Sequence, residues 1–104
     1  MDKFRIGNTW YDVTYRKVIK SKQGKLLLGD IDFDNGRIRI CNKFTRQTML
    51  QTKFHECTHG LFQEYGVDGD EDDVCLMTSA FYGFIIDNSE FIKDILKFAE
   101  GVKG

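Results

Sequence analysis

The chain has 104 residues, of which 15 are basic and 16 acidic, and its formal net charge is -1. That length suits one domain with a modest core and leaves no room for a separate substrate-binding lobe, so we expect any active site to be a shallow cleft. The balanced charge indicates no nucleic-acid partner, no segment is apolar for long enough to cross a bilayer, and the residues after Met1 do not read as a signal peptide. We therefore expect a cytoplasmic protein without a membrane partner.

The first forty residues have the pattern of β-strands. Residues 3–6 and 10–15 are rich in β-formers and flank Gly7-Asn8, which predicts a hairpin. Apolar and charged residues alternate on both sides of Asn35-Gly36, and this pattern predicts a second hairpin between about residues 30 and 40. We expect a small antiparallel sheet within residues 1–41.

The remainder of the chain reads as helices. Residues 45–65 contain no proline, with Thr45 as a plausible N-cap and Gly66 as a stop. Apolar residues at helical spacing predict two further helices within residues 71–101, the last of them docked on the core. The predicted fold class is α+β: a small N-terminal antiparallel sheet followed by three helices, forming a single domain over residues 1–104. In the first helix the residues expected to face the core are Phe54, Cys57, Thr58, Leu61 and Tyr65.

Three cysteines, Cys41, Cys57 and Cys75, are an odd number and form no C-x-x-C pair. This usage argues against a disulfide framework. We expect reduced, buried thiols, consistent with an intracellular protein.

Both histidines of the chain lie in the pentapeptide His55-Glu56-Cys57-Thr58-His59, which matches the H-E-x-x-H signature. Residues four apart on a helix lie on the same face, so the two imidazoles can bind one Zn²⁺ ion. Glu56 would then lie beside the metal and act as the general base toward a water molecule that the metal activates. The motif therefore predicts metal-assisted hydrolysis.

A catalytic zinc site needs a third protein ligand. The chain has no third histidine, and Tyr65 stands where a metzincin would have one. An acidic residue from the next helix is the remaining solution, and Asp70, Glu71, Asp72 and Asp73 are the candidates, although acidic residues often only cap a helix N-terminus. We favour Glu71, with His55 and His59, because it shares a helix face with Val74 and Thr78 and has the longer side chain. Asp72 ranks second and Cys75, as a thiolate, third.

Residues 51–88 resemble the small ImmA/IrrE-like metallopeptidases of phages, prophages and mobile elements. The similarity lies in His55-Glu56-Cys57-Thr58-His59 and in Glu71-Asp72-Asp73-Val74, which matches the E-x-x-A/V opening of the family's second helix. It implies a minimal zincin-like fold of gluzincin type, with His55, His59 and Glu71 as zinc ligands and Glu56 as general base. It also implies a phage-encoded regulator in the host cytoplasm that cleaves or disables a repressor.

The chain departs from the larger members of that family. Its interval between His59 and Glu71 is shorter, the L-M-P-like segment after the second helix is missing, and we expect no helix-turn-helix partner domain. The identity of the substrate therefore does not transfer.

Our leading hypothesis is a zinc-dependent metallopeptidase that hydrolyses peptide bonds in a regulatory protein of a phage or mobile element. We expect an extended peptide to pair with the sheet edge along residues 37–41. One alternative is a non-catalytic, zinc-stabilised protein-binding module, similar to an anti-repressor; another is a zinc-free α+β domain. A His/His/Glu site also suits Mn²⁺ and Fe²⁺, and the sequence does not indicate an oligomeric state.

Overall fold

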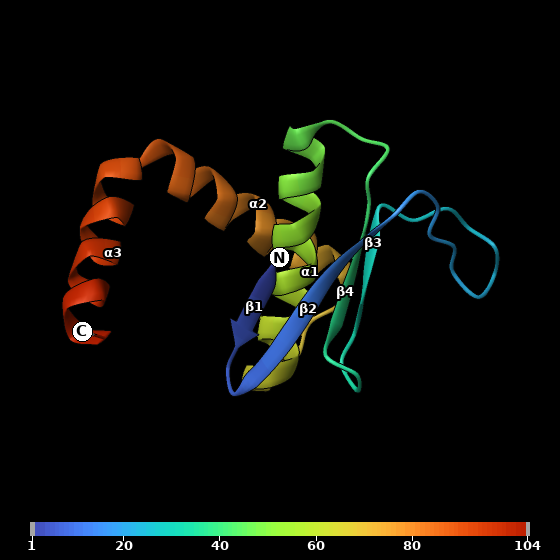
Figure 1. Cartoon of the computed structure of the whole chain (residues 1–104), viewed down its shortest axis with the longest axis horizontal. Coiled ribbons are helices and arrows are strands. Elements are labelled where there is room, and N and C mark those ends of the chain that lie inside the picture. The colour runs from blue at the N-terminus through green and yellow to red at the C-terminus, as the bar shows by residue number, and fades with distance from the viewer. Residues whose placement is uncertain (1, 104) are drawn as a thin grey trace.

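A computed structural model describes residues 2–103. It confirms the α+β class, with a four-stranded sheet at the N-terminus followed by three helices (Figure 1). Met1 and Gly104, the two ends of the expected domain, lie outside the described residues. The elements are β1 (Lys3–Ile6), β2 (Thr9–Arg16), β3 (Gly29–Asp32), β4 (Arg37–Cys41), α1 (Arg46–Tyr65), α2 (Glu71–Asp87) and α3 (Ser89–Lys103).

The sheet has the strand order β1-β2-β4-β3 and is mixed. The two predicted hairpins, β1–β2 and β3–β4, are antiparallel, but β2 and β4 are parallel, so the prediction of an antiparallel sheet is wrong at this pair. The reason is the connection formed by residues 17–28, which carries the chain to the far edge of the sheet before β4 returns to the centre. Ile38 and Ile40 of β4 are fully buried, as expected for a central strand with a parallel neighbour.

Helix α1 packs on the sheet and contacts β1, β3 and β4. The helix comes close because Gly60 has no side chain: a Cβ atom there would lie 2.8 Å from Cδ1 of Ile6. The prediction of the core-facing stripe on α1 was wrong in part, because Leu61 and Tyr65 are 38% and 67% exposed whereas Glu56 is 6% exposed. The buried apolar cluster of the sheet comprises Ile6, Tyr11, Val13, Ile38 and Ile40.

The ends of α1 and α2 follow local capping chemistry. Thr45 is the N-cap of α1 and its hydroxyl accepts a hydrogen bond from the Thr48 amide, while Gly66 ends the helix in the left-handed conformation. Asp70 and Asp73 form a reciprocal capping box at the start of α2. These caps bound the loop of residues 66–70, which leads the chain from α1 into α2, and α2 then packs on α1.

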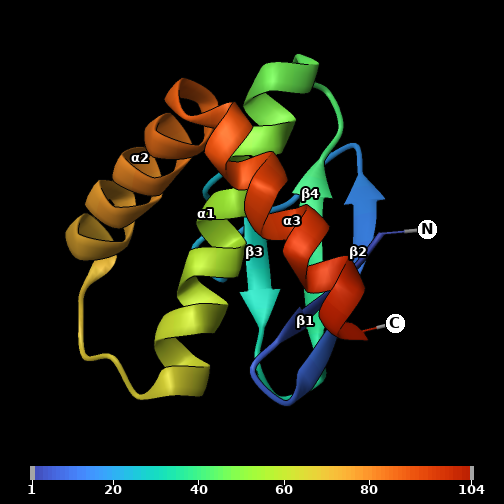
Figure 2. The same cartoon turned by 90° about the vertical axis from the view of Figure 1, so that its left-hand side faces the viewer.

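Helix α3 is not docked on the core, so that prediction was wrong. None of its residues is buried, and its contacts are mainly with α2, where the rings of Phe84 and Phe91 meet edge to face at 6.4 Å. Only Asn88 separates the two helices, and Figures 1 and 2 show α3 turning sharply away from the end of α2. Within residues 2–103, none of the helices combines the length and the apolar character that a bilayer-spanning segment requires.

Candidate metal site and cleft

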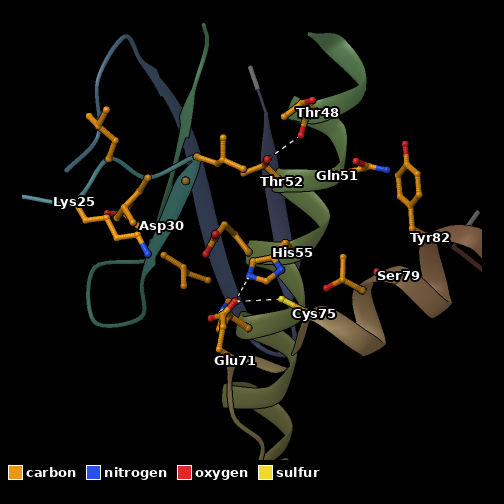
Figure 3. Close-up of a pocket in the computed structure, with 18 of the residues that line it drawn as sticks. Lys25, Asp30, Thr48, Gln51, Thr52, His55, Glu71, Cys75, Ser79 and Tyr82 are labelled. Carbon is orange, nitrogen blue, oxygen red and sulfur yellow. Dashed lines mark hydrogen bonds and ion pairs between the residues drawn. The ribbon is translucent and has the colours of Figure 1, made fainter. Parts of the chain in front are cut away.

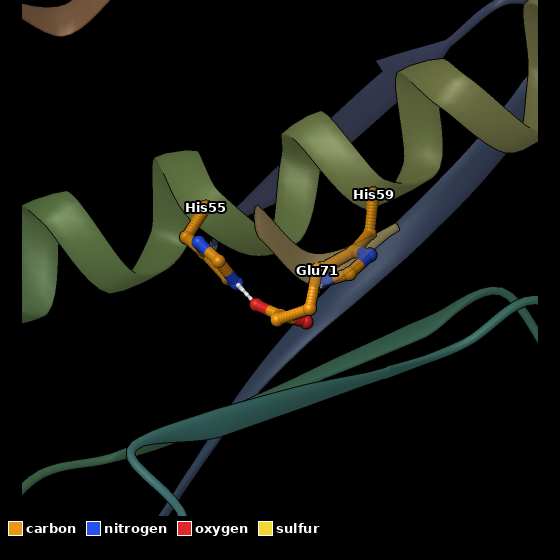
Figure 4. Close-up of side chains that lie close together, drawn as sticks. All are labelled: His55, His59 and Glu71. Carbon is orange, nitrogen blue, oxygen red and sulfur yellow. Dashed lines mark ion pairs between the residues drawn. The ribbon is translucent and has the colours of Figure 1, made fainter. Parts of the chain in front are cut away.

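Three of the residues predicted as metal ligands converge between α1 and α2. Oε1 of Glu71 lies 2.6 Å from Nε2 of His55, and Oε2 of Glu71 lies 3.0 Å from Nε2 of His59 (Figure 4). His55 and His59 stand one helical turn apart on α1, with ring centroids 4.9 Å apart, and Glu71 is the first residue of α2. One ligand atom from each residue lies within 4.8 Å of the other two, so this group could hold a metal ion.

The donor set and its spacing fit a zinc ion. Zn²⁺ takes imidazole nitrogen and carboxylate oxygen at about 2.0–2.2 Å, which places tetrahedral ligand atoms about 3.4 Å apart. The 2.6 and 3.0 Å contacts are slightly shorter than this separation. The Glu71 side chain is 62% exposed, so its carboxylate can move away from the two imidazoles to the separation that zinc requires without disturbing the core.

Glu56 is the only charged residue among those that are buried in the described part of the chain. Burial raises the pKa of its carboxyl to about 8, and the negative charges of Glu71 and Asp30 act in the same direction. Despite its burial, Glu56 lines the same cleft as its neighbour His55. A carboxyl group with a pKa near neutrality is therefore held beside the three candidate ligands.

The environment of His59 favours a neutral imidazole. Burial lowers the pKa of His59 and the neighbouring His55 lowers it further, while the Glu71 carboxylate acts in the opposite direction. A metal-binding imidazole must be unprotonated. The site therefore keeps His59 in the form that can bind a cation.

The rival ligands do not join this group. Asp70 and Asp73 are engaged in the α2 capping box, and Asp72 is exposed outside the group. The Cys75 thiol donates a hydrogen bond of 3.7 Å to Oε1 of Glu71, and desolvation and the Glu71 charge raise its pKa, which keeps it a thiol. Cys41, Cys57 and Cys75 are all free, but the prediction of buried thiols holds only for Cys41, because Cys57 is half-buried and Cys75 is exposed.

The three candidate ligands line a cleft of about 980 Å³ between β3, α1 and α2 (Figure 3). Residues 25–28 and β3 form one wall, α1 the floor and α2 the opposite wall. The predicted peptide edge at residues 37–41 was wrong, because β4 is hydrogen-bonded on both sides, to β2 and β3. The free edge beside the site is β3.

Thr78 is a cleft residue that the sequence did not single out as functional. It is 7% exposed, and its Oγ1 has no hydrogen-bond partner among residues 2–103. The sequence could have indicated Thr78 as a cleft residue, because it lies seven residues after Glu71 and residues seven apart share a helix face.

Comparisons of the chain with protein-family models, with curated proteins and with solved structures gave no match. The resemblance to ImmA/IrrE-like metallopeptidases therefore stays a prediction from the motif residues.

Proposed function

We propose that the protein is a zinc-dependent metallopeptidase that cleaves an extended peptide segment in the cleft between β3 and α2. The observation that carries this proposal is the convergence of His55, His59 and Glu71, with ligand atoms within 4.8 Å, on the wall of a cleft that also contains buried Glu56. A pair of histidines from one helix, a carboxylate from the next and a second carboxylate beside them is the donor set of a hydrolytic zinc centre.

Each residue has a distinct role in this mechanism. His55 and His59 would hold the cation from α1 and Glu71 from α2, and a bound zinc ion would polarise the scissile carbonyl and lower the pKa of water to about 7. Glu56 accepts the proton of the attacking water on a carboxylate oxygen and returns it to the leaving amine. The free backbone groups of β3 pair with the extended peptide and fix its scissile bond over the site.

The proposal is tested by metal content and hydrolysis together. Native mass spectrometry of the wild type should find about one zinc ion per chain, lost in His59→Ala and in Glu71→Ala. Glu56→Gln should keep the zinc and lose hydrolysis of a degenerate peptide library by at least a hundredfold, because it removes the proton acceptor but not a ligand. Glu64→Gln, the same change elsewhere on α1 and outside the cleft, is the matched control and should cleave like the wild type.

One observation favours a second candidate, a zinc-stabilised binding module that does not cut its partner. Among the three candidate ligands only Glu71 comes from α2, and it pairs with both histidines of α1. A cation bound there would therefore hold the two helices together even if the site catalysed no hydrolysis. In that case Glu56→Gln would leave the function in cells intact, while His59→Ala would destabilise the fold. Equal peptide turnover by Glu56→Gln and the wild type would contradict the proposed peptidase mechanism.

A further inference from the structure

The α2–α3 hairpin carries a concentration of exposed apolar residues, none of which lines the cleft of the candidate metal site. The side chains of this set are between 47% and 74% exposed. We refer to them as the α2–α3 apolar face: Phe84, Phe91, Ile95, Leu96, Phe98 and Val102.

The sequence of α3 has an apolar stripe, which is typical of a helix that packs against another surface. Phe91, Ile95, Phe98 and Val102 follow one another at four- and three-residue intervals, which places them along one stripe. A helix of 15 residues is marginal in water by itself, because most helical stability in proteins comes from packing of the apolar side. In residues 89–103 no side chain is buried, so the packing that α3 requires is not supplied within one copy.

The size of the face matches half of a dimer interface. At about 200 Å² per fully covered phenylalanine, the three exposed rings contribute about 350 Å². The three aliphatic side chains add roughly 300 Å² more. The total of about 650 Å² exceeds the apolar share, about 500 Å², of the roughly 800 Å² that each partner contributes to a stable homodimer. It also exceeds the largest apolar patch of a typical monomer, about 300–600 Å².

The charges of the two helices indicate a permanent protein partner. Helix α2 has no charged residue between Val74 and Ile86, and such depletion is typical of homodimer interfaces, whereas transient interfaces are as polar as ordinary surface. Helices that bind membranes are rich in Lys and Arg, but α3 carries three basic and three acidic residues and is neutral overall. These residues are Glu90, Lys93, Asp94, Lys97, Glu100 and Lys103.

We propose that the protein is a symmetric homodimer in which the α2–α3 apolar faces of two copies pack against each other. A two-fold axis brings the same face of both copies together, so the apolar stripe of each α3 is covered by the other copy. The candidate metal site is not part of this contact, because none of the residues of the α2–α3 apolar face lines the cleft. The assembly is thus independent of whether the site binds zinc.

Sedimentation equilibrium of the full chain tests the proposal. The wild type should have a mass of about 24 kDa, twice the 12.1 kDa of one chain, at high micromolar concentration. Phe98→Asp should sediment as a monomer, because it places a charge in the centre of the interface. Lys97→Asp introduces the same residue at the adjacent position on the polar side of α3 and should remain a dimer.

Circular dichroism of each variant shows whether it has folded, and the mass of the wild type decides the question even if Phe98→Asp does not fold. A wild type that stays monomeric at high concentration overturns the proposal. So does a monomer whose α3 amides are protected from hydrogen exchange, because α3 would then close on its own chain, and so does a monomer that floats with phosphatidylcholine vesicles, because the partner would be lipid. Equal dissociation of both variants would place the interface elsewhere.

Discussion

Two buried threonines on the helices differ in whether their hydroxyl group has a partner. Oγ1 of Thr58 donates to the Phe54 carbonyl at 2.8 Å, whereas Oγ1 of Thr78 has no partner within residues 2–103. Burying a hydroxyl group without a hydrogen bond costs about 1–3 kcal/mol. We therefore expect Thr78→Val to raise the free energy of unfolding by about 1 kcal/mol, measured by urea denaturation of the metal-free protein.

Thr58→Val is the matched control, because it makes the same change at a position whose hydroxyl group is bonded. It should lower the free energy of unfolding by up to about 1 kcal/mol. If Thr78→Val also destabilises the protein, its hydroxyl group has a partner and the structural interpretation of the cleft wall is wrong.

The candidate ligand residues could be predicted from the sequence because their spacing is set by local geometry. His55 and His59 stand four residues apart on a helix whose cap and stop were visible, and Glu71 opens the next helix. Two features could not be predicted: the burial of Glu56 and the lack of a hydrogen-bond partner for the Thr78 hydroxyl group within residues 2–103. Each depends on how closely a helix approaches the neighbouring element. Gly60 sets that approach for α1.

At the scale of elements, an ion pair ties the start of the chain to α1. Nζ of Lys53 lies 2.7 Å from Oδ2 of Asp2, and the Tyr15 hydroxyl on β2 donates to the same carboxylate. The hydrogen bonds from Lys53 and Tyr15 lower the pKa of Asp2 below its usual value of 3.8. A carboxyl whose pKa is lower in the folded state stabilises the fold above pH 4, and this contribution is lost as the pH falls through the folded-state pKa.

We expect Asp2→Asn to destabilise the protein at pH 7 and to flatten the loss of stability below pH 4. The effect should not exceed about 1 kcal/mol, because the Asp2 side chain is 41% exposed and solvent screens the pair. Thermal unfolding between pH 2 and pH 7 measures it. Asp68→Asn, which removes the same charge in the loop before α2, is the control, and an equal pH response of the two variants would contradict this role of Asp2.

Element type was more predictable than element arrangement. Hairpins and helices follow from turns, caps and periodicity within a few residues, and these predictions agree with the structure. The parallel pairing of β2 with β4 and the free position of α3 arise from contacts between segments distant in sequence. An apolar stripe such as that of α3 shows that a helix has a partner, but not which surface provides it.

For the molecule as a whole, the candidate metal site joins the body formed by the sheet and α1 to the hairpin formed by α2 and α3. Glu71 pairs with His55 and His59 across the two parts, in addition to the direct packing of α2 on α1. A ligand that binds only the folded state stabilises it by about 2.7 kcal/mol at a hundred times its Kd. Zinc should therefore raise the melting temperature of the wild type by about 10 °C or more, given about 4–8 °C per kcal/mol for a chain of this size.

Differential scanning fluorimetry with and without EDTA measures this shift. Glu71→Ala should show little or none of it, because it loses the ligand that links the helices. Mg²⁺ should also have little effect, because it prefers an octahedral shell of oxygen atoms. A wild type whose melting temperature does not respond to zinc would contradict the metal site and, with it, the proposed peptidase.

The parallel pair at the centre of the sheet also affects how the chain folds. Each hairpin and α1 can form from residues close in sequence, but β2 and β4 belong to different hairpins, and Asp12 pairs with Arg37 across the connection of residues 17–28. Closing such a connection costs chain entropy before its contacts form, which slows folding. We therefore expect the pairing of the two hairpins to be the slow step of folding, during which Ile38 and Ile40 are exposed and prone to aggregation.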